Sequence, residues 1–178
     1  MQKIIGIDEV GYGSWAGPLY ICALKFLEPP NFKLFDSKKI SEKKRQLLFP
    51  LIEEISEYRI GIASVEEINT LGLAQAYKKA LLRATEEIEG KFIIDGKKPK
   101  YFDCEAIIKG DSIIQEISAA SIIAKVTRDN YMQEISSTFP EYKLNKNKGY
   151  GTKEHQEAIK KHGFSEMHRV IYDIKKYL

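Results

Sequence analysis

The chain contains very little cysteine and histidine for its length. Only two cysteines, Cys22 and Cys104, occur among its 178 residues. Two cysteines form neither a disulfide framework nor a metal-ligand pattern, so we expect free thiols in a reducing cytoplasm. The three histidines, His155, His162 and His168, lack the spacing of zinc ligands. The sequence therefore disfavours disulfide-stabilised and zinc-dependent classes of protein.

Long apolar runs are also absent. No segment approaches the ~18 unbroken apolar residues that a membrane-spanning helix needs. The first apolar run, in MQKIIGIDEV, reaches only to Asp8 and is too short for the core of a secretory signal. We therefore expect no membrane partner and a cytoplasmic location.

Internal repeats and low-complexity tracts are missing as well, and the hydrophobic fraction of 43% is ordinary for a globular protein. The length fits a single domain over residues 1–178, and a monomer is the default expectation. The net charge of +3 comes from 28 basic and 25 acidic residues. Such a mixed surface permits a nucleic-acid partner but does not require one.

The pattern of apolar residues predicts an α/β fold. Three early strands joined by short loops suggest an antiparallel meander, and later strands alternate with helices. The order β-β-β-α-α-β-β-α-α predicts a sheet that contains both antiparallel and parallel strands, with a helical C-terminal part from about residue 140 to 178. The expected strands cover residues 3–8, 19–26, 58–65, 91–96 and 104–111.

Acidic residues stand at the ends of three predicted strands: Asp8 and Glu9 together, then Asp95, then Asp111. Functional groups gather just beyond strand ends in open α/β sheets, so four carboxylates would converge if these strands are neighbours. Divalent cations relieve the resulting repulsion, and Mg²⁺ prefers carboxylate and water oxygens. Two such ions about 4 Å apart clamp both oxygens of a phosphodiester displacement. Solvated turns also favour aspartate, and spacing alone leaves both interpretations open.

Basic residues and one tyrosine flank the predicted acidic site. Lys38 and Lys39 lie in a loop, while Lys125 and Arg128 lie in a predicted helix. Beside metal ligands they would position a phosphate backbone, although basic runs are often only a solvated face. Tyr150 stands between two glycines, where an exposed ring would stack on a sugar or base. A core position for this tyrosine is the alternative.

Several blocks together resemble one family. They are GIDEVGYG with AGP, DSKKISEKKR, IIDG, IIKGDS, SAASIIAKVTRD and NKGYGTKEH, and they run from residue 4 to about residue 169. In this order they are similar to type 2 ribonuclease H, the bacterial ribonuclease HII. Each block alone is weak evidence, but the set is specific.

The resemblance implies a ribonuclease H-like mixed five-stranded sheet flanked by helices, with additional C-terminal helices. It implies that Asp8, Glu9, Asp95 and Asp111 are the catalytic residues and bind two Mg²⁺ or Mn²⁺ ions. The implied activity is endonucleolytic cleavage of RNA in RNA–DNA hybrids, or of a ribonucleotide embedded in DNA, on its 5′ side. The products carry 3′-hydroxyl and 5′-phosphate ends.

The resemblance also implies a substrate surface. The DSK block would lie against the substrate, and Tyr150 would pack on the deoxyribose after the junction. The glycine-flanked loop would read the ribose 2′-hydroxyl through its backbone, because a Cβ there would push the sugar away. The expected substrate-binding residues are Gly11, Tyr12, Gly13, Ser37, Lys38, Lys39, Lys125, Arg128 and Tyr150.

One residue departs from the family pattern: Tyr12 replaces the arginine of a Gly-Arg-Gly motif. Tyrosine supplies only a neutral hydroxyl and a ring, so a ribonuclease HIII-like preference for hybrid tracts stays open. A catalytically impaired hybrid-binding protein is the second alternative. A Holliday-junction resolvase on the same fold is the third. The short C-terminus, ending at Leu178, suggests a reduced duplex-clasping helix.

Overall fold

The computed structural model describes residues 2–34 and 40–171. Its centre is a five-stranded sheet in the order β3-β2-β1-β4-β5. The strands are β1 (Ile4–Val10), β2 (Leu19–Phe26), β3 (Ser56–Ala63), β4 (Lys91–Asp95) and β5 (Glu105–Ile107). The pairs β1–β2 and β2–β3 are antiparallel, whereas β1–β4 and β4–β5 are parallel. The predicted mixed sheet is therefore confirmed.

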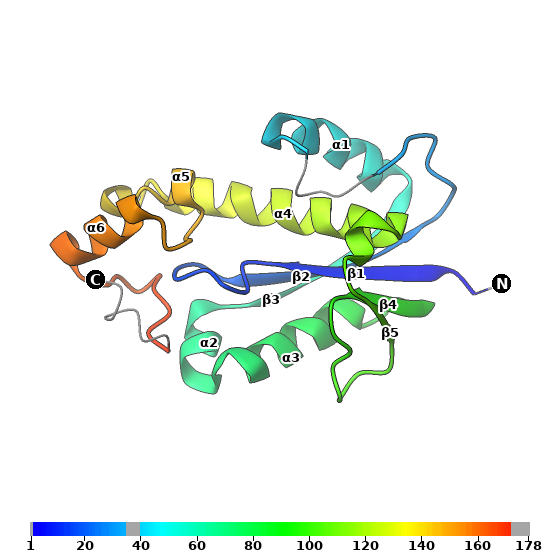
Figure 1. Ribbon diagram of the computed structural model, residues 1–178, viewed down its shortest axis with the longest axis horizontal. Helices are drawn as coiled ribbons and strands as arrows, with labels where there is room; N and C mark the ends of the chain where they lie inside the picture. The colour runs from blue at the N-terminus through cyan, green and yellow to red at the C-terminus, as the bar shows by residue number, and fades with distance from the viewer. Residues whose placement is uncertain (1, 35–39, 172–178) are drawn as a thin grey trace.

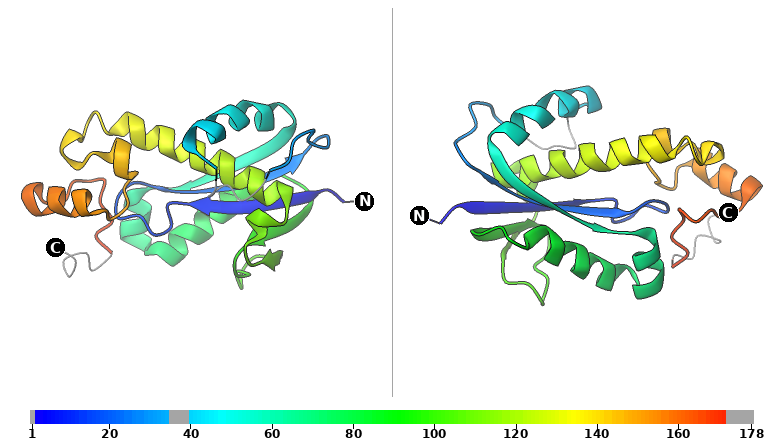
Figure 2. Two further views of the ribbon diagram at one scale, coloured as in Figure 1. Left: turned by 45° about the horizontal axis from the view of Figure 1, so that its top comes forward. Right: turned by 180° about the vertical axis from the view of Figure 1, so that it is seen from behind.

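Helices cover both faces of the sheet. α1 and α4 lie on one face, and α2 and α3 lie on the other (Figures 1 and 2). The helices are α1 (Glu42–Glu54), α2 (Val65–Leu71), α3 (Leu73–Thr85), α4 (Gln115–Ile135), α5 (Leu144–Asn147) and α6 (Lys153–His162). The predicted short-loop meander is wrong in one connection, because α1 stands between β2 and β3. The two strands nevertheless pair directly.

Local sequence signals explain where the helices begin and end. Ser64 and Glu67 form a capping box, in which each side chain bonds the other residue's backbone N–H, and α2 begins there. Gly72, with a φ of 76°, separates α2 from α3. Thr152 caps α6 through the N–H of His155, and Gly163 ends this helix.

The alternation of side chains along β1 divides the core in two. Ile5 and Ile7 pack with α3 on one face, and Val10 packs with α4 on the other. Gly6 shares the face of Val10, and a Cβ on Gly6 would lie 2.2 Å from the backbone of Glu116. Helix α4 therefore lies directly on β1, which its run of small residues permits.

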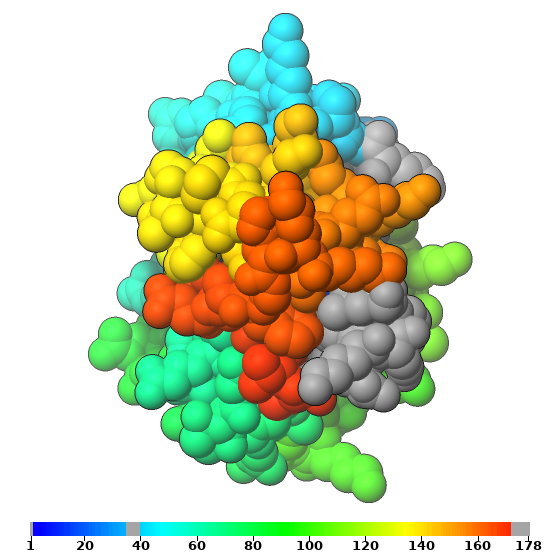
Figure 3. Space-filling view, turned by 90° about the vertical axis from the view of Figure 1, so that its left-hand side faces the viewer, coloured from blue at the N-terminus to red at the C-terminus, as the bar shows by residue number. Residues whose placement is uncertain are grey.

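The C-terminal segment closes the end of the molecule at which β1 terminates. Figure 3 looks onto this end, where α6 and the chain after it lie between α1 at the top and α2 and α3 at the bottom. The segment is tied to the loop after β1, since the N–H groups of Trp15 and Ala16 donate to the Gly149 carbonyl at 2.8 and 3.0 Å. Among the described residues no helix is long and apolar enough to cross a bilayer. Cys22 and Cys104 are buried free thiols.

Candidate active site

The sheet brings the predicted acids to one edge. β1 and β4 are parallel neighbours with Ile7 opposite Ile94, so Asp8 and Asp95 follow at adjacent positions. The Asp95 Oδ1 accepts a hydrogen bond of 2.7 Å from the Gly110 N–H. That bond joins the end of β4 to the 3₁₀ turn η2 (Gly110–Ser112), which carries the buried Asp111. Asp111 thus lies in a turn after β5 rather than at the end of a strand.

Asp8 and Glu9 do not point the same way, because consecutive residues of a strand face opposite sides of a sheet. Asp8 lies on the α4 face, where its carboxyl group forms a hydrogen bond with the hydroxyl of Ser121. Glu9 lies toward α3 and shares a surface hollow with Tyr77 and Asp95. The two neighbouring carboxylates therefore flank the edge of the sheet from both faces.

The carboxyl group of Asp8 is electrostatically unusual. Burial, and then the charge of Glu9, raise the pKa of Asp8 to about 7, while a hydrogen bond with the Ser121 hydroxyl acts in the opposite direction. Asp8 is only 3% exposed, and its Oδ2 accepts no hydrogen bond within the described part of the chain. A buried carboxylate oxygen without a donor is costly unless a cation binds it.

The donor set fits a hard divalent cation, since it consists of carboxylate oxygens. Within residues 2–34 and 40–171, however, no three acidic, histidine or cysteine side chains already meet as a ligand group. The backbone brings Asp8, Glu9, Asp95 and Asp111 into one neighbourhood, and a shared ion would require their side chains to turn toward it. Like-charged carboxylates do so only when a cation compensates their charge.

A hollow of about 300 Å³ opens beside these acids. One side is the loop after β1, with Gly11, Tyr12 and Gly13, and the other side includes Lys125 of α4 and Tyr150. Gly13 has nothing within 4 Å of the position of a Cβ, so its backbone is open to a bound group. Five of the nine predicted substrate-binding residues therefore share one cavity.

Comparison with known proteins decides the family. A family model described as "Ribonuclease HII" matches residues 5–175. A curated protein from Borrelia hermsii named "Ribonuclease HII" is 49% identical over 93% of this chain and 96% of its own length. The chain belongs to the ribonuclease HII family. It is therefore a ribonuclease H, a hydrolase that acts as an endonuclease, and this family depends on a divalent metal.

Solved structures share the fold at low sequence identity. The structure titled as a PCNA:RNase HII complex from Archaeoglobus fulgidus is 20% identical, with a TM-score of 0.83 over 96% of this chain and 95% of that chain. A Bst-RNase HIII described as a complex with Mn²⁺ is 18% identical, with a TM-score of 0.71 over 98% of this chain and 68% of that one. Both likenesses agree with the ribonuclease H-like sheet described above.

The family interpretation of two residues needs correction. Arg128 is fully buried, and its guanidinium donates to the carbonyls of Pro18, Lys148 and Ala16 at 2.8 to 3.1 Å. It therefore holds the loop after β1 to the Tyr150 loop and is not exposed to a phosphate. Gly11 has a φ of 87°, and its missing Cβ leaves room for Arg128 rather than for a sugar.

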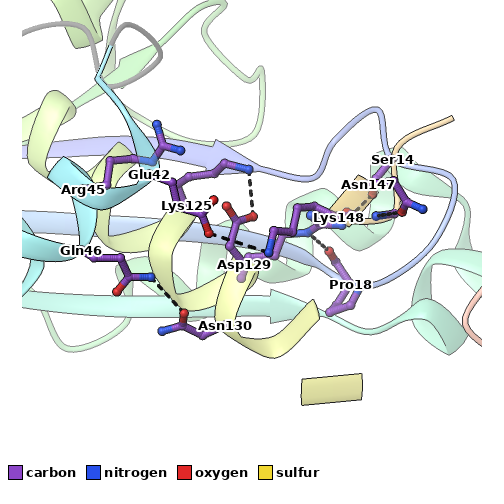
Figure 4. Close-up of polar contacts among 12 residues, drawn as sticks. Ser14, Pro18, Glu42, Arg45, Gln46, Lys125, Asp129, Asn130, Asn147 and Lys148 are labelled. Atoms are coloured by element: carbon purple, nitrogen blue, oxygen red, sulfur yellow. Dashed lines mark hydrogen bonds and ion pairs between the residues drawn. The ribbon is translucent and has the colours of Figure 1, made fainter. Parts of the chain in front are cut away.

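Lys125 occupies an intermediate position. Its side chain is partly exposed, lines the hollow, and pairs with Asp129 at 2.8 Å (Figure 4). Its ammonium group lies 5.9 Å from the centre of the Tyr150 ring. Ser37, Lys38 and Lys39 of the DSK block lie outside the described residues.

The sequence-based interpretation missed several residues that shape the site. Arg169 is fully buried and donates to the carbonyls of Tyr12 and Gly17 at 3.0 and 2.8 Å, so it fixes the glycine-flanked loop from the far end of the chain. Ser121 approaches Asp8 from α4. Nothing in the local sequence marks these two residues, because their roles depend on contacts between distant segments.

A pair of buried histidines holds the Tyr150 backbone. The Ser165 N–H donates to Nδ1 of His168, so the proton of neutral His168 is on Nε2, which lies 3.1 Å from Nε2 of His155. The His155 Nδ1 therefore carries a proton and donates to the Tyr150 carbonyl at 2.9 Å. Both rings must be neutral for this chain of hydrogen bonds to hold.

We expect this pair to make stability depend on pH. Burial, and then the charge of His155, lower the pKa of His168 from 6.5 to about 4, and burial also lowers the pKa of His155. The unfolded chain therefore takes up protons below pH 6.5 that the folded chain does not. The contribution of His168 to the free energy of unfolding is complete above pH 6.5 and declines by about 3 kcal/mol as the pH falls to 4.

Urea unfolding at pH 7.5 and pH 4.5 measures this effect. His168→Gln should show a smaller drop in unfolding free energy between the two pH values than the unaltered chain. His162→Gln, at an exposed position on α6, should retain the full drop. An equal drop in the His168 variant would contradict the assignment.

Proposed function

We propose that this ribonuclease H cleaves RNA–DNA hybrids, and DNA that contains single ribonucleotides, on the 5′ side of a ribonucleotide. Asp8, Glu9, Asp95 and Asp111 hold two Mg²⁺ or Mn²⁺ ions in this proposal, and the products carry 3′-hydroxyl and 5′-phosphate ends. The whole chain acts as one catalytic domain, with its helical C-terminal part from about residue 140. It works as a monomer in the cytoplasm.

The observation that carries the proposal is the buried carboxyl of Asp8. Its Oδ2 lacks a donor within the described residues, and Asp95 follows at the adjacent position on the parallel strand β4. When bound, the metal ions supply Lewis-acid stabilisation of the attacking and leaving oxygens of the phosphodiester. The fold relative that is described with Mn²⁺ supports this choice of ion.

The remaining residues of the hollow bind and orient the nucleic acid. Gly13 leaves its backbone accessible, so a ribose 2′-hydroxyl can approach the main chain there. Lys125 lines the same hollow and would contact a phosphate, while the Tyr150 ring would pack on the deoxyribose that follows the junction. Buried Arg128 and Arg169 keep both loops in place before substrate arrives.

Tyr12 gives one alternative a specific basis. It is 48% exposed and lines the hollow where relatives of this family would place an arginine. Without that charge, recognition of a lone ribonucleotide rests on the backbone, and longer hybrid tracts supply more contacts. A ribonuclease HIII-like preference for hybrid tracts is therefore the second candidate.

Two labelled duplexes distinguish these candidates. One carries a single ribonucleotide in DNA and the other is an RNA–DNA hybrid, and each is incubated with Mg²⁺ and separately with Mn²⁺. We expect a single cut on the 5′ side of the lone ribonucleotide, together with multiple cuts in the hybrid. Cleavage of the hybrid alone would favour the second candidate. Binding without cleavage of either duplex would favour the impaired hybrid-binding protein.

A further inference from the structure

A second hollow lies on the α3 side of the sheet edge that carries Asp8 and Asp95, opposite the hollow that contains Tyr150. It has a volume of about 420 Å³, within the range of ligand-binding clefts. Glu9 and Tyr12 line both this hollow and the one that contains Tyr150, so these two residues form the wall between them. Asp95 also lines the second hollow, which therefore begins at the acids themselves.

Three tyrosines gather in this hollow. Tyr12 comes from the loop after β1, Tyr77 from α3, and Tyr101 from the loop between β4 and β5. The rings of Tyr12 and Tyr77 meet edge to face, with centroids 5.8 Å apart. Tyr12 and Tyr101 are 48% and 41% exposed, so both rings are accessible to a ligand in the hollow. Burial raises the pKa of Tyr77, and the charge of Glu9 raises it further, so its phenol is neutral.

Basic residues accompany the rings. Lys97 and Lys98 line the hollow from the loop between β4 and β5, which runs beside α3 (Figure 1). The ammonium group of Lys78 lies 5.2 Å from the centre of the Tyr101 ring. Aromatic faces beside lysines are the combination with which proteins hold the bases and phosphates of a nucleic-acid strand.

We propose that this hollow binds the nucleotides on the 5′ side of the scissile phosphate. Tyr12 and Tyr101 pack against a sugar or base, and Lys97 and Lys98 contact the phosphates. The inference rests on the proposed function: the strand crosses the acids, and Tyr150 lies on its 3′ side in the first hollow. The second hollow is the next surface that the strand reaches in the 5′ direction.

This arrangement also gives Tyr12 a role. The tyrosine ring at this position packs edge to face on Tyr77 and extends the aromatic wall, whereas an arginine would add a fixed positive charge with bidentate donors for a phosphate. The substitution of tyrosine for the family arginine therefore shifts substrate contacts from phosphate toward stacking.

Tyr101→Ala tests the proposal, because Tyr101 lies on an exposed loop and its loss should not affect folding. We compare two duplexes that each carry one ribonucleotide: one has a long DNA arm on the 5′ side, and in the other this arm is cut short near the ribonucleotide. We expect the variant to raise KM about tenfold on the long-arm duplex with kcat unchanged, and to match the unaltered enzyme on the short-arm duplex.

Lysine variants supply the matched control. Lys97→Ala should weaken binding of the long-arm duplex and reduce the dependence of affinity on salt. Lys100→Ala removes a neighbouring exposed lysine that does not line the hollow, and it should change neither. Equal KM values for Tyr101→Ala and the unaltered enzyme on the long arm, or equal losses on both duplexes, would overturn the proposal.

Equilibrium binding separates this result from failure of the proposed function. Fluorescence anisotropy with the same two duplexes, in the absence of divalent metal, compares affinities without any cleavage. If the unaltered protein binds but does not cut, the proposed reaction fails. The arm-dependent loss of affinity in Tyr101→Ala still decides whether the second hollow binds the 5′ nucleotides.

Discussion

Replacing Asp95 with asparagine is expected to reduce cleavage about a thousandfold or more while leaving the fold intact. Metal-based stabilisation of a phosphodiester transition state is worth several kcal/mol, and each 1.4 kcal/mol corresponds to a factor of about ten in rate. An asparagine keeps an Oδ1 that accepts the hydrogen bond from the Gly110 N–H, so the turn with Asp111 should persist. Single-turnover cleavage of a hybrid with Mg²⁺ measures the effect.

Glu105→Gln is the matched control for this substitution. Glu105 lies on β5, and its exposed carboxylate pairs with Lys91 at 2.7 Å, away from both hollows. The same loss of one negative charge there should leave the cleavage rate within about twofold, because an exposed ion pair contributes little. Near-normal cleavage by Asp95→Asn, with an unchanged melting temperature, would refute the assignment of the carboxylates.

Arg128→Leu should produce the largest loss of stability. The guanidinium donates to the carbonyls of Pro18, Ala16 and Lys148, and also to the Ser14 hydroxyl at 3.0 Å. Leucine leaves these acceptors buried without donors, and each such group costs about 1–3 kcal/mol. Burial lowers the pKa of Arg128, so removing the buried cation offsets part of this cost. We expect a net loss of about 3 kcal/mol in urea unfolding.

Arg59→Leu provides the comparison. Arg59 is exposed on β3 and, among residues 2–34 and 40–171, donates one hydrogen bond, to the carbonyl of the adjacent Tyr58 at 3.1 Å. Its replacement should change the unfolding free energy by less than about 0.5 kcal/mol. A loss below about 1 kcal/mol in Arg128→Leu would mean that the loop after β1 does not depend on this anchor.

The two predictions concern two features of the same site, its acidic residues and the buried arginines that hold the loops around them. The acids of β1 and β4 provide charge that the fold alone does not compensate, as the raised pKa and unpaired Oδ2 of Asp8 indicate. The buried arginines provide the rigidity that holds the loops around this charge. In sites of this kind the functional groups destabilise the folded state locally, and the contacts of the surrounding residues offset that loss.

The sequence by itself determined most of the secondary structure and the family. Short apolar runs located β1, β2 and β4, and the local caps Ser64 and Thr152 mark the starts of α2 and α6. These features depend on residues close together in the chain, so local physical rules suffice to recognise them. The four acids were also visible, because each follows or ends a short apolar run.

Only the tertiary structure decided how these residues face one another. Pairing of β1 with β4 sets Asp8 beside Asp95, and the alternation of the strand sends Glu9 to the other face. Arg128 looked like a phosphate ligand in the sequence, but α4 packs it beneath the loop after β1. Its role depends on the contacts of a buried charge with carbonyls far away in the chain, and residue type and spacing carry no information about such contacts.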